Sequence, residues 1–224
     1  MPHDNRGFTL VEMLIAITIL SMVLVTGNYV YFQLVSRWDS QLGNFQQTAK
    51  STKLVYQLDR LLSAIQPYVI RNEQGIPVFL FEGGRSSILA VASSGLIYDQ
   101  QPVVFRLSLI KDKSGNKLIY QSLKLAEQVV SSAQQQLNFT QSVVLLESVD
   151  TLELSYFGWR NLSDKAARVG HPVWQPKYSG IEQELVPSEI SLTLQLGQQQ
   201  LAVVTNLDPN PNRWLRHYFD SSNT

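Results

Sequence analysis

The 224-residue sequence contains no cysteine, and this absence excludes disulfides and any zinc or redox site built on cysteine thiolates. It does not identify a compartment, because a protein outside the cytoplasm need not contain disulfides. Histidine is scarce as well, and neither His171 nor His217 has a carboxylate or a second histidine at ligand spacing. Residues 208–212 superficially resemble a calcium loop, but they lack its central glycine and closing glutamate, so they are interpreted as a turn. We expect no metal and no cofactor.

Charged side chains are also few, at 16% of the sequence against about 25% in an ordinary globular domain. The 18 basic and 18 acidic residues balance, so no net field attracts nucleic acid, and we expect nucleic-acid binding to be absent. Gly83-Gly84 lacks the lysine and the spacing of a phosphate-binding loop, and no nucleophile elbow is present. The sequence therefore predicts a protein that is not an enzyme.

Charge is nearly absent from residues 8–35, where Glu12 is the only ionisable carboxylate or basic group. A helix rises about 1.5 Å per residue, so about 20 apolar residues cross the ~30 Å hydrocarbon core of a bilayer. The run therefore predicts a transmembrane helix. A secretory signal would place a small-residue cleavage site after its apolar region, whereas Gly7 stands before the apolar run of this sequence. A signal peptide and a plain signal anchor are the alternatives, and both leave Glu12 unexplained.

A carboxylate inside a membrane segment costs at least ~2.5–3.5 kcal/mol and therefore indicates a function. The stretch that contains it, Arg-Gly-Phe-Thr-Leu-Val-Glu at residues 6–12, resembles the signature of type IV pilins and pseudopilins. The resemblance implies that a prepilin peptidase cleaves between Gly7 and Phe8 and that Phe8 is then N-methylated. It also places Glu12 at the fifth position of the mature chain, where it neutralises the new amine within the subunit or on a neighbour. We expect Glu12 to be needed for filament assembly.

The helical pattern continues beyond the apolar run, through residues 36–66, and Pro67 then provides a stop signal. Apolar side chains recur at intervals of three or four in this part, which is typical of an amphipathic helix packed on a sheet. The predicted stripe comprises Leu34, Trp38, Leu42, Phe45, Ala49, Thr52, Val55, Leu58, Leu62 and Ile65. A coiled coil with another subunit is the alternative use of the same stripe.

After Pro67 the pattern changes to short alternating runs separated by turn residues, which predicts antiparallel strands. The predicted strands are 78–81, 88–92, 103–110, 117–125, 143–149, 152–159, 189–196 and 201–205. Residues 126–142 are expected to form a loop or short helix, and residues 160–186 a long irregular excursion. The fold class is therefore α+β, and the resemblance implies a pilin-like fold. Its expected parts are a leader (1–7), a transmembrane segment (8–35), an amphipathic helix half (36–66), a β-rich periplasmic domain (67–206) and a loose tail (207–224).

The C-terminal order of a strand, a variable loop and a final hairpin resembles the J-type minor pseudopilins of type II secretion systems. That resemblance implies a non-enzymatic subunit at the pseudopilus tip, a single pass through the bacterial inner membrane and a periplasmic C-terminal domain. The implied partners are I-, K- and H-type and major G-type pseudopilins, the inner-membrane assembly platform and the prepilin peptidase. A minor pilin priming a type IV pilus of the mannose-sensitive haemagglutinin kind, or a DNA-uptake competence pseudopilin, are the alternatives.

Three large aromatic side chains in the C-terminal loops, Trp159, Trp174 and Tyr178, are candidate contacts for a neighbouring subunit. Exposed aromatic residues are favoured hot spots in protein interfaces. The alternative is that they fill gaps in a small hydrophobic core. Exposure of each ring in the folded domain distinguishes the two interpretations.

Overall fold

The computed structural model describes residues 9–112, 115–208, 211 and 213–215, and gives side chains for all of these except residues 36–48. Its contacts divide the chain into two compact units, residues 1–51 and 52–224. Helix α1, Leu10–Ser63, contributes residues to both units. The predicted helix is therefore confirmed, with ends that differ from the prediction by no more than three residues, the ordinary scatter of helix boundaries.

The last turns of α1 provide one side of the core of the 52–224 unit. Their buried side chains are Leu54, Leu58, Leu61 and Leu62, and Ile65, two residues after the helix ends, is buried in the same core. The predicted stripe contains three of these and misses Leu54 and Leu61, whereas its member Thr52 is exposed. Positions four and seven residues apart share a helix face, so burying Leu58 and Leu62 also buries the flanking leucines. The buried face at the end of α1 is wider than the predicted stripe because it packs against both larger sheets.

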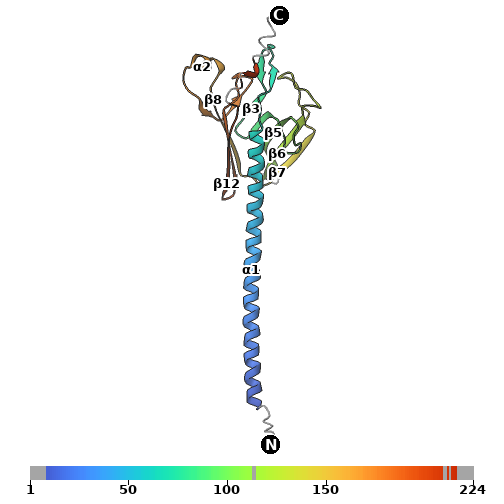
Figure 1. Cartoon of the computed structure of the whole chain (residues 1–224), viewed down its shortest axis with the longest axis vertical. Coiled ribbons are helices and arrows are strands. Elements are labelled where there is room, and N and C mark those ends of the chain that lie inside the picture. The colour runs from blue at the N-terminus through green and yellow to red at the C-terminus, as the bar shows by residue number, and fades with distance from the viewer. Residues whose placement is uncertain (1–8, 113–114, 209–210, 212, 216–224) are drawn as a thin grey trace, which may run out of the picture. The chain divides into compact units, whose positions relative to one another are not determined.

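Strands form a six-stranded sheet ordered β10-β3-β4-β5-β6-β7, a four-stranded sheet ordered β12-β11-β8-β9, and the pair β1-β2 over the described residues. Their bounds are β1 Val69–Arg71, β2 Pro77–Phe79, β3 Phe81–Gly83, β4 Ser87–Ala92, β5 Val103–Asp112, β6 Gly115–Lys124, β7 Gln141–Leu146, β8 Thr151–Gly158, β9 Val173–Gln175, β10 Tyr178–Ser179, β11 Glu189–Leu196 and β12 Gln199–Asn206. In Figure 1, β8 and β12 lie on one side of the end of α1, and β5, β6 and β7 lie on the other. The α+β class predicted from the sequence is confirmed.

Two predicted hairpins are present with antiparallel register. β5 and β6 pair from Val103↔Lys124 to Asp112↔Gly115. β11 and β12 pair up to Leu196↔Gln199, where Gly197 adopts a positive φ of 57° that glycine reaches without steric cost. The β11-β12 turn falls where the sequence places glycine and a polar residue between alternating apolar runs, and residues 113–114 between β5 and β6 lie outside the described ranges.

The region expected to be an irregular excursion, residues 160–186, contains regular structure instead. It includes the helix α2, Leu162–Ala167, and strands β9 and β10. The side chain of Asn161 caps α2 by accepting a hydrogen bond from the Asp164 N–H at 2.7 Å. The short elements escape sequence analysis because α2 spans only six residues, β9 three and β10 two, which is too few for a hydrophobic period to repeat recognisably.

The described part of the C-terminal tail packs against the domain, in contrast to the loose tail expected from residue 207 onward. Leu207 and Leu215 are buried and belong to the main core. Leu207 lies between polar residues, and the only apolar residue beside Leu215 is Trp214, so no periodicity indicates their burial. The remaining tail residues, 209–210, 212 and 216–224, lie outside the described ranges.

An aromatic cluster joins the two larger sheets. The ring of Phe81 on β3 meets those of Tyr156 on β8 and Tyr178 on β10 edge-on, at centroid distances of 5.7 and 6.2 Å. The Tyr156 hydroxyl donates a hydrogen bond of 2.9 Å to the carbonyl oxygen of Gly84. Gly83 lets the Tyr156 ring lie directly against the backbone of β3, since a Cβ there would be 2.3 Å from the ring.

Candidate functional site

Residues Leu10–Val35 of α1 form a helical segment long and apolar enough to cross a membrane. Its large apolar side chains are exposed along the whole segment. The hydroxyls of Thr18, Ser21 and Thr26 donate to carbonyl oxygens three or four residues earlier in the same helix, at 2.7–2.8 Å. Polar groups satisfied in this way do not oppose insertion into hydrocarbon, where every donor needs an internal partner. The segment fits a single-pass membrane anchor.

Glu12 lies in the first turn of α1 and forms a capping box with Thr9. Its Oε2 accepts hydrogen bonds from the backbone N–H of Thr9 at 3.0 Å and from the Thr9 hydroxyl at 3.1 Å. The backbone N–H of Glu12 donates in return to Thr9 Oγ1 at 3.3 Å. Thr9 therefore begins the helix and holds the Glu12 carboxylate at its positive end.

This geometry determines what the carboxylate can do. The positive end of α1 stabilises a negative charge that would otherwise be costly in hydrocarbon. A carboxylate has about four lone-pair sites, so Glu12 can bind Thr9 and accept from a cationic amine at the same time. Gly7 and Phe8, the predicted cleavage and methylation positions, lie outside the described residues. The Glu12 carboxylate is the acceptor in this site that is suited to binding a cation.

Sequence reasoning identified Glu12 but missed Thr9. The signal was present, because threonine followed three residues later by glutamate, directly before an apolar run, is the sequence form of a capping box. The pairing gives the polar residue at position 9 a structural role at the start of the apolar segment. Thr9 thus belongs to the same site as Glu12, because it donates the hydrogen bonds that position the Glu12 carboxylate.

Comparison with known families gives a match on this segment. Residues 2–27 match the prokaryotic N-terminal methylation motif. The chain thus carries the type IV pilin-like prepilin signal, and this signal implies processing by a prepilin peptidase and assembly with other pilin-like subunits. No curated protein matches the chain.

The three aromatic residues predicted to contact partners occupy different environments. Tyr178 is buried in the core, and its hydroxyl donates to the carbonyl oxygen of Trp159 at 3.1 Å. Burial also raises the pKa of the Tyr178 phenol. Trp159 is half-buried against the same core, whereas Trp174 is 48% exposed. The Tyr178 ring therefore has no surface to offer a partner, and Trp174 is the exposed member of the set.

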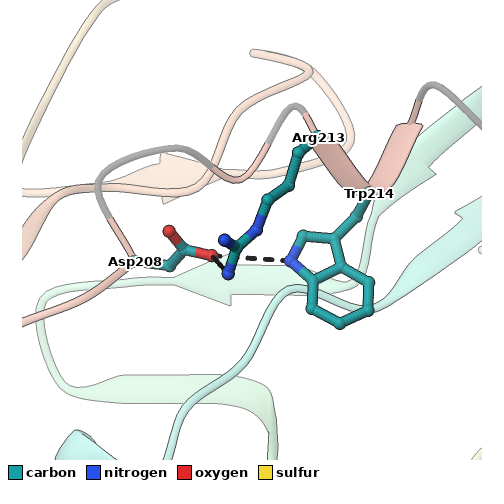
Figure 2. A network of polar contacts seen from close by, with 3 residues as sticks. All are labelled: Asp208, Arg213 and Trp214. Carbon is teal, nitrogen blue, oxygen red and sulfur yellow. Dashed lines mark hydrogen bonds and ion pairs between the residues drawn. The ribbon is translucent and has the colours of Figure 1, made fainter.

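The turn after β12 contains a polar network centred on Asp208 (Figure 2). Its Oδ2 accepts from the guanidinium of Arg213 at 3.1 Å and from the indole N–H of Trp214 at 3.4 Å. The calcium-like spacing at residues 208–212 therefore begins with a carboxylate, Asp208, that binds a side-chain cation, and residues 209–210 and 212 lie outside the described ranges. Within the described ranges, no group of three or more histidine and carboxylate residues could hold a metal.

Proposed function

We propose that this chain is a minor pseudopilin of the J type, a non-enzymatic subunit at the tip of a type II secretion pseudopilus. In this proposal a prepilin peptidase removes residues 1–7, Phe8 is N-methylated, and the mature chain is anchored in the inner membrane by residues 8–35. The domain from residue 67 onward lies in the periplasm. The methylation motif at residues 2–27 and the apolar span Leu10–Val35 support this part of the proposal.

The observation that carries the proposal is the position of Glu12 at the start of an apolar helix. Removal of the leader would leave a positive amine on Phe8, four residues before the carboxylate. Either charge alone is costly in a low-dielectric medium, and the cost falls when the two pair. Pairing between the Glu12 of one subunit and the amine of the next would also define the axial register of a filament.

The J type is supported by the order of elements in the C-terminal half. Strand β8 is followed by the excursion with α2 and β9, and then by the β11-β12 hairpin. This order resembles J-type pseudopilins, whose implied partners are the I-, K- and H-type subunits, the major G-type subunit and the assembly platform. The subunit would contribute binding geometry: a helix for the membrane bundle and a two-sheet domain for lateral contacts.

Substitution at Glu12 tests the proposal. Glu12→Ala should leave peptidase processing intact and reduce incorporation of the chain into filaments by at least tenfold beside wild-type subunits. Ser21→Ala is the matched control, because it removes a polar group of the same span that only bonds its own helix. Immunoblots of sheared filaments and membranes measure both quantities. Equal incorporation of the Glu12→Ala and Ser21→Ala chains would refute the proposed role.

A second experiment distinguishes the secretion system from a type IV pilus or a DNA-uptake apparatus. The full chain, extracted in a mild detergent, should co-purify with I- and K-type pseudopilins when they are expressed together. Co-purification with pilus-type minor pilins in place of them would assign the chain to an adhesive pilus. Salt-sensitive binding of single-stranded DNA would assign it to DNA uptake.

A further inference from the structure

The connection between β8 and β10 projects from the edge of the four-stranded sheet. After Gly158 the chain forms α2, turns at residue 168 and returns as β9, the outermost strand of that sheet. Pairing of Gly158 with Val173 closes the excursion at its base. In Figure 1, α2 lies at the outer margin of the domain, beyond the strand β8. Residues 159–177 are named here the flap. The β8-β9 pairing anchors the flap to the edge of the sheet.

Trp174 is an exposed aromatic side chain with a rigid support. Its ring lies 5.4 Å from the ring of Phe157, the residue it faces across the β8-β9 pair. The indole is nevertheless 48% exposed, and Val169 at the tip of the flap is 63% exposed. A supported, half-exposed tryptophan loses little conformational entropy on binding, which is why such residues dominate interface energies.

Charge on the flap is one-sided, although the whole chain has equal numbers of acidic and basic residues. The flap has four cationic side chains and one carboxylate, Asp164, which accepts from the Asn161 amide at 3.1 Å. Arg160, Arg168 and Lys177 are exposed. The ion pairs among described residues are Lys117–Asp112, Lys124–Glu127 and Arg213–Asp208, so these three cations have no carboxylate partner among them.

Arg168 occupies a position where glycine would be easier to accommodate. It ends α2 in the left-handed conformation, with φ 54° and ψ 37°, and its N–H bonds the carbonyl oxygens of Asp164 and Lys165. Glycine is the usual residue at such a helix end because it has no Cβ to strain. An arginine there keeps a cation on the flap at a steric cost to the fold.

A densely charged polyanion such as nucleic acid would meet repulsion beside the flap. Glu189 pairs with Phe157 in the sheet register, so its side chain lies on the same face as the aromatic pair. Glu153 lies on that face as well, four residues before Phe157 in β8. Nucleic acid carries a negative charge every ~1.7 Å of duplex and would meet both carboxylates. A peptide strand with a carboxylate at every second residue carries a negative charge only every ~6.6 Å, so it meets less repulsion from the two glutamates.

We propose that the flap docks an acidic segment of a neighbouring pilin-like subunit. Trp174 makes the central apolar contact, and Arg160, Arg168 and Lys177 pair with carboxylates around it. Charge complementarity selects the partner segment, and the tryptophan supplies most of the affinity. The identity of the partner as a subunit of the same assembly rests on the function proposed above, whereas the acidic chemistry rests on the flap alone.

A binding measurement tests the chemistry. The full chain in nonionic detergent micelles is titrated against a fluorescein-labelled 14-residue peptide of alternating glutamate and leucine, and anisotropy is recorded. Trp174→Ser should weaken binding by about tenfold or more, as expected for a central aromatic residue. Arg168→Gly should weaken binding about threefold while its urea midpoint stays equal or rises, because glycine relieves the left-handed strain. A lysine-leucine peptide of the same length should not bind.

Two results in this assay would overturn the proposal. One is wild-type affinity in both variants, which would show that the flap does not contact the acidic peptide. The other is competition by a 14-nucleotide single-stranded DNA as strong as that by unlabelled peptide, which would assign the flap to nucleic acid. The opposite responses of stability and affinity expected for Arg168→Gly separate a binding role from a structural one.

Photo-crosslinking in cells tests the source of the segment. A benzoyl-phenylalanine at position 174 of the full chain should form an adduct with an acidic stretch of another subunit that carries the methylation motif. The control position is Val204, exposed on β12 at the opposite edge of the sheet, which should not give that adduct. Adducts with an exported protein or with no protein, in cells where the chain is processed and incorporated, would refute the docking partner but leave the proposed function intact. A chain that remains unprocessed would refute the proposed function instead.

Discussion

Replacing Gly83 with alanine should strongly destabilise the junction between the two larger sheets. A Cβ at this position would lie 2.3 Å from Cζ of Tyr156, whereas ordinary contacts begin at 3.4 Å, so about 1.1 Å must be gained by movement. The Tyr156 ring cannot easily provide it, because it is buried and packs edge-on against Phe81 at 5.7 Å. Strand β3 cannot either, because it is paired on both sides, with β10 and β4.

The magnitude follows from two contributions. Overpacking a well-filled core costs about 1–3 kcal/mol, and an overlap of this size belongs at the upper end of that range. Displacing Tyr156 also breaks its hydrogen bond to the Gly84 carbonyl, which contributes about 1 kcal/mol. We therefore expect Gly83→Ala to lower the free energy of unfolding by about 3–4 kcal/mol, a large share of the ~5–15 kcal/mol of a typical domain.

The adjacent glycine provides a matched control. A Cβ at Gly84 would lie 3.3 Å from the Ser87 hydroxyl oxygen, which can rotate away, so Gly84→Ala should change stability by less than about 0.5 kcal/mol. Both variants of the full chain in detergent micelles are unfolded with urea and followed by near-ultraviolet circular dichroism. In a Tyr156→Leu background, Gly83→Ala should cost much less, because the two sites are in contact. Equal urea midpoints for Gly83→Ala and Gly84→Ala would refute the reasoning.

Three further predictions concern charged and capping groups. Burial, with a smaller contribution from Glu182, raises the pKa of the Glu82 carboxyl above its ordinary 4.5. The protonated carboxyl therefore stabilises the fold below pH 4.5, and this stabilisation is lost as the pH rises through the raised pKa. Glu82→Gln should therefore raise the urea midpoint at pH 7 and leave it unchanged near pH 4. Thr9→Val should cost the first turn of α1 about 1 kcal/mol, seen as faster amide hydrogen exchange there, whereas Thr9→Ser should not. Asp208→Asn should lower stability by less than about 1 kcal/mol, because its partner Arg213 is 61% exposed, and a larger loss would show that the tail network is more than a surface contact.

The parts of the fold that were predictable from sequence are those with a sustained period. The apolar run at 8–35, the helical spacing up to Pro67 and the strand alternation around residues 103–125 and 189–205 each repeat over several turns or pairs, and the structure contains the elements they predict. Glu12 could be identified because a carboxylate is conspicuous among apolar neighbours.

The features that could not be predicted depend on tertiary contacts. The burial of Leu54 and Leu61 follows from two sheets meeting one helix, and the burial of Leu215 from a core that is distant in sequence. The close approach of Tyr156 to Gly83 joins residues more than seventy positions apart, and no local pattern encodes it. Trp174 and Tyr178 are equivalent as sequence signals, and only their strand positions make one exposed and the other buried.

Intact mass spectrometry of the chain purified from membranes of a peptidase-containing host tests most directly how this protein matures. We expect a chain that begins at Phe8 with one added methyl group on its amine. A chain that still begins at Met1, or one that is cleaved beyond residue 35, would contradict the claim that Glu12 is matched by a new amine at the helix start.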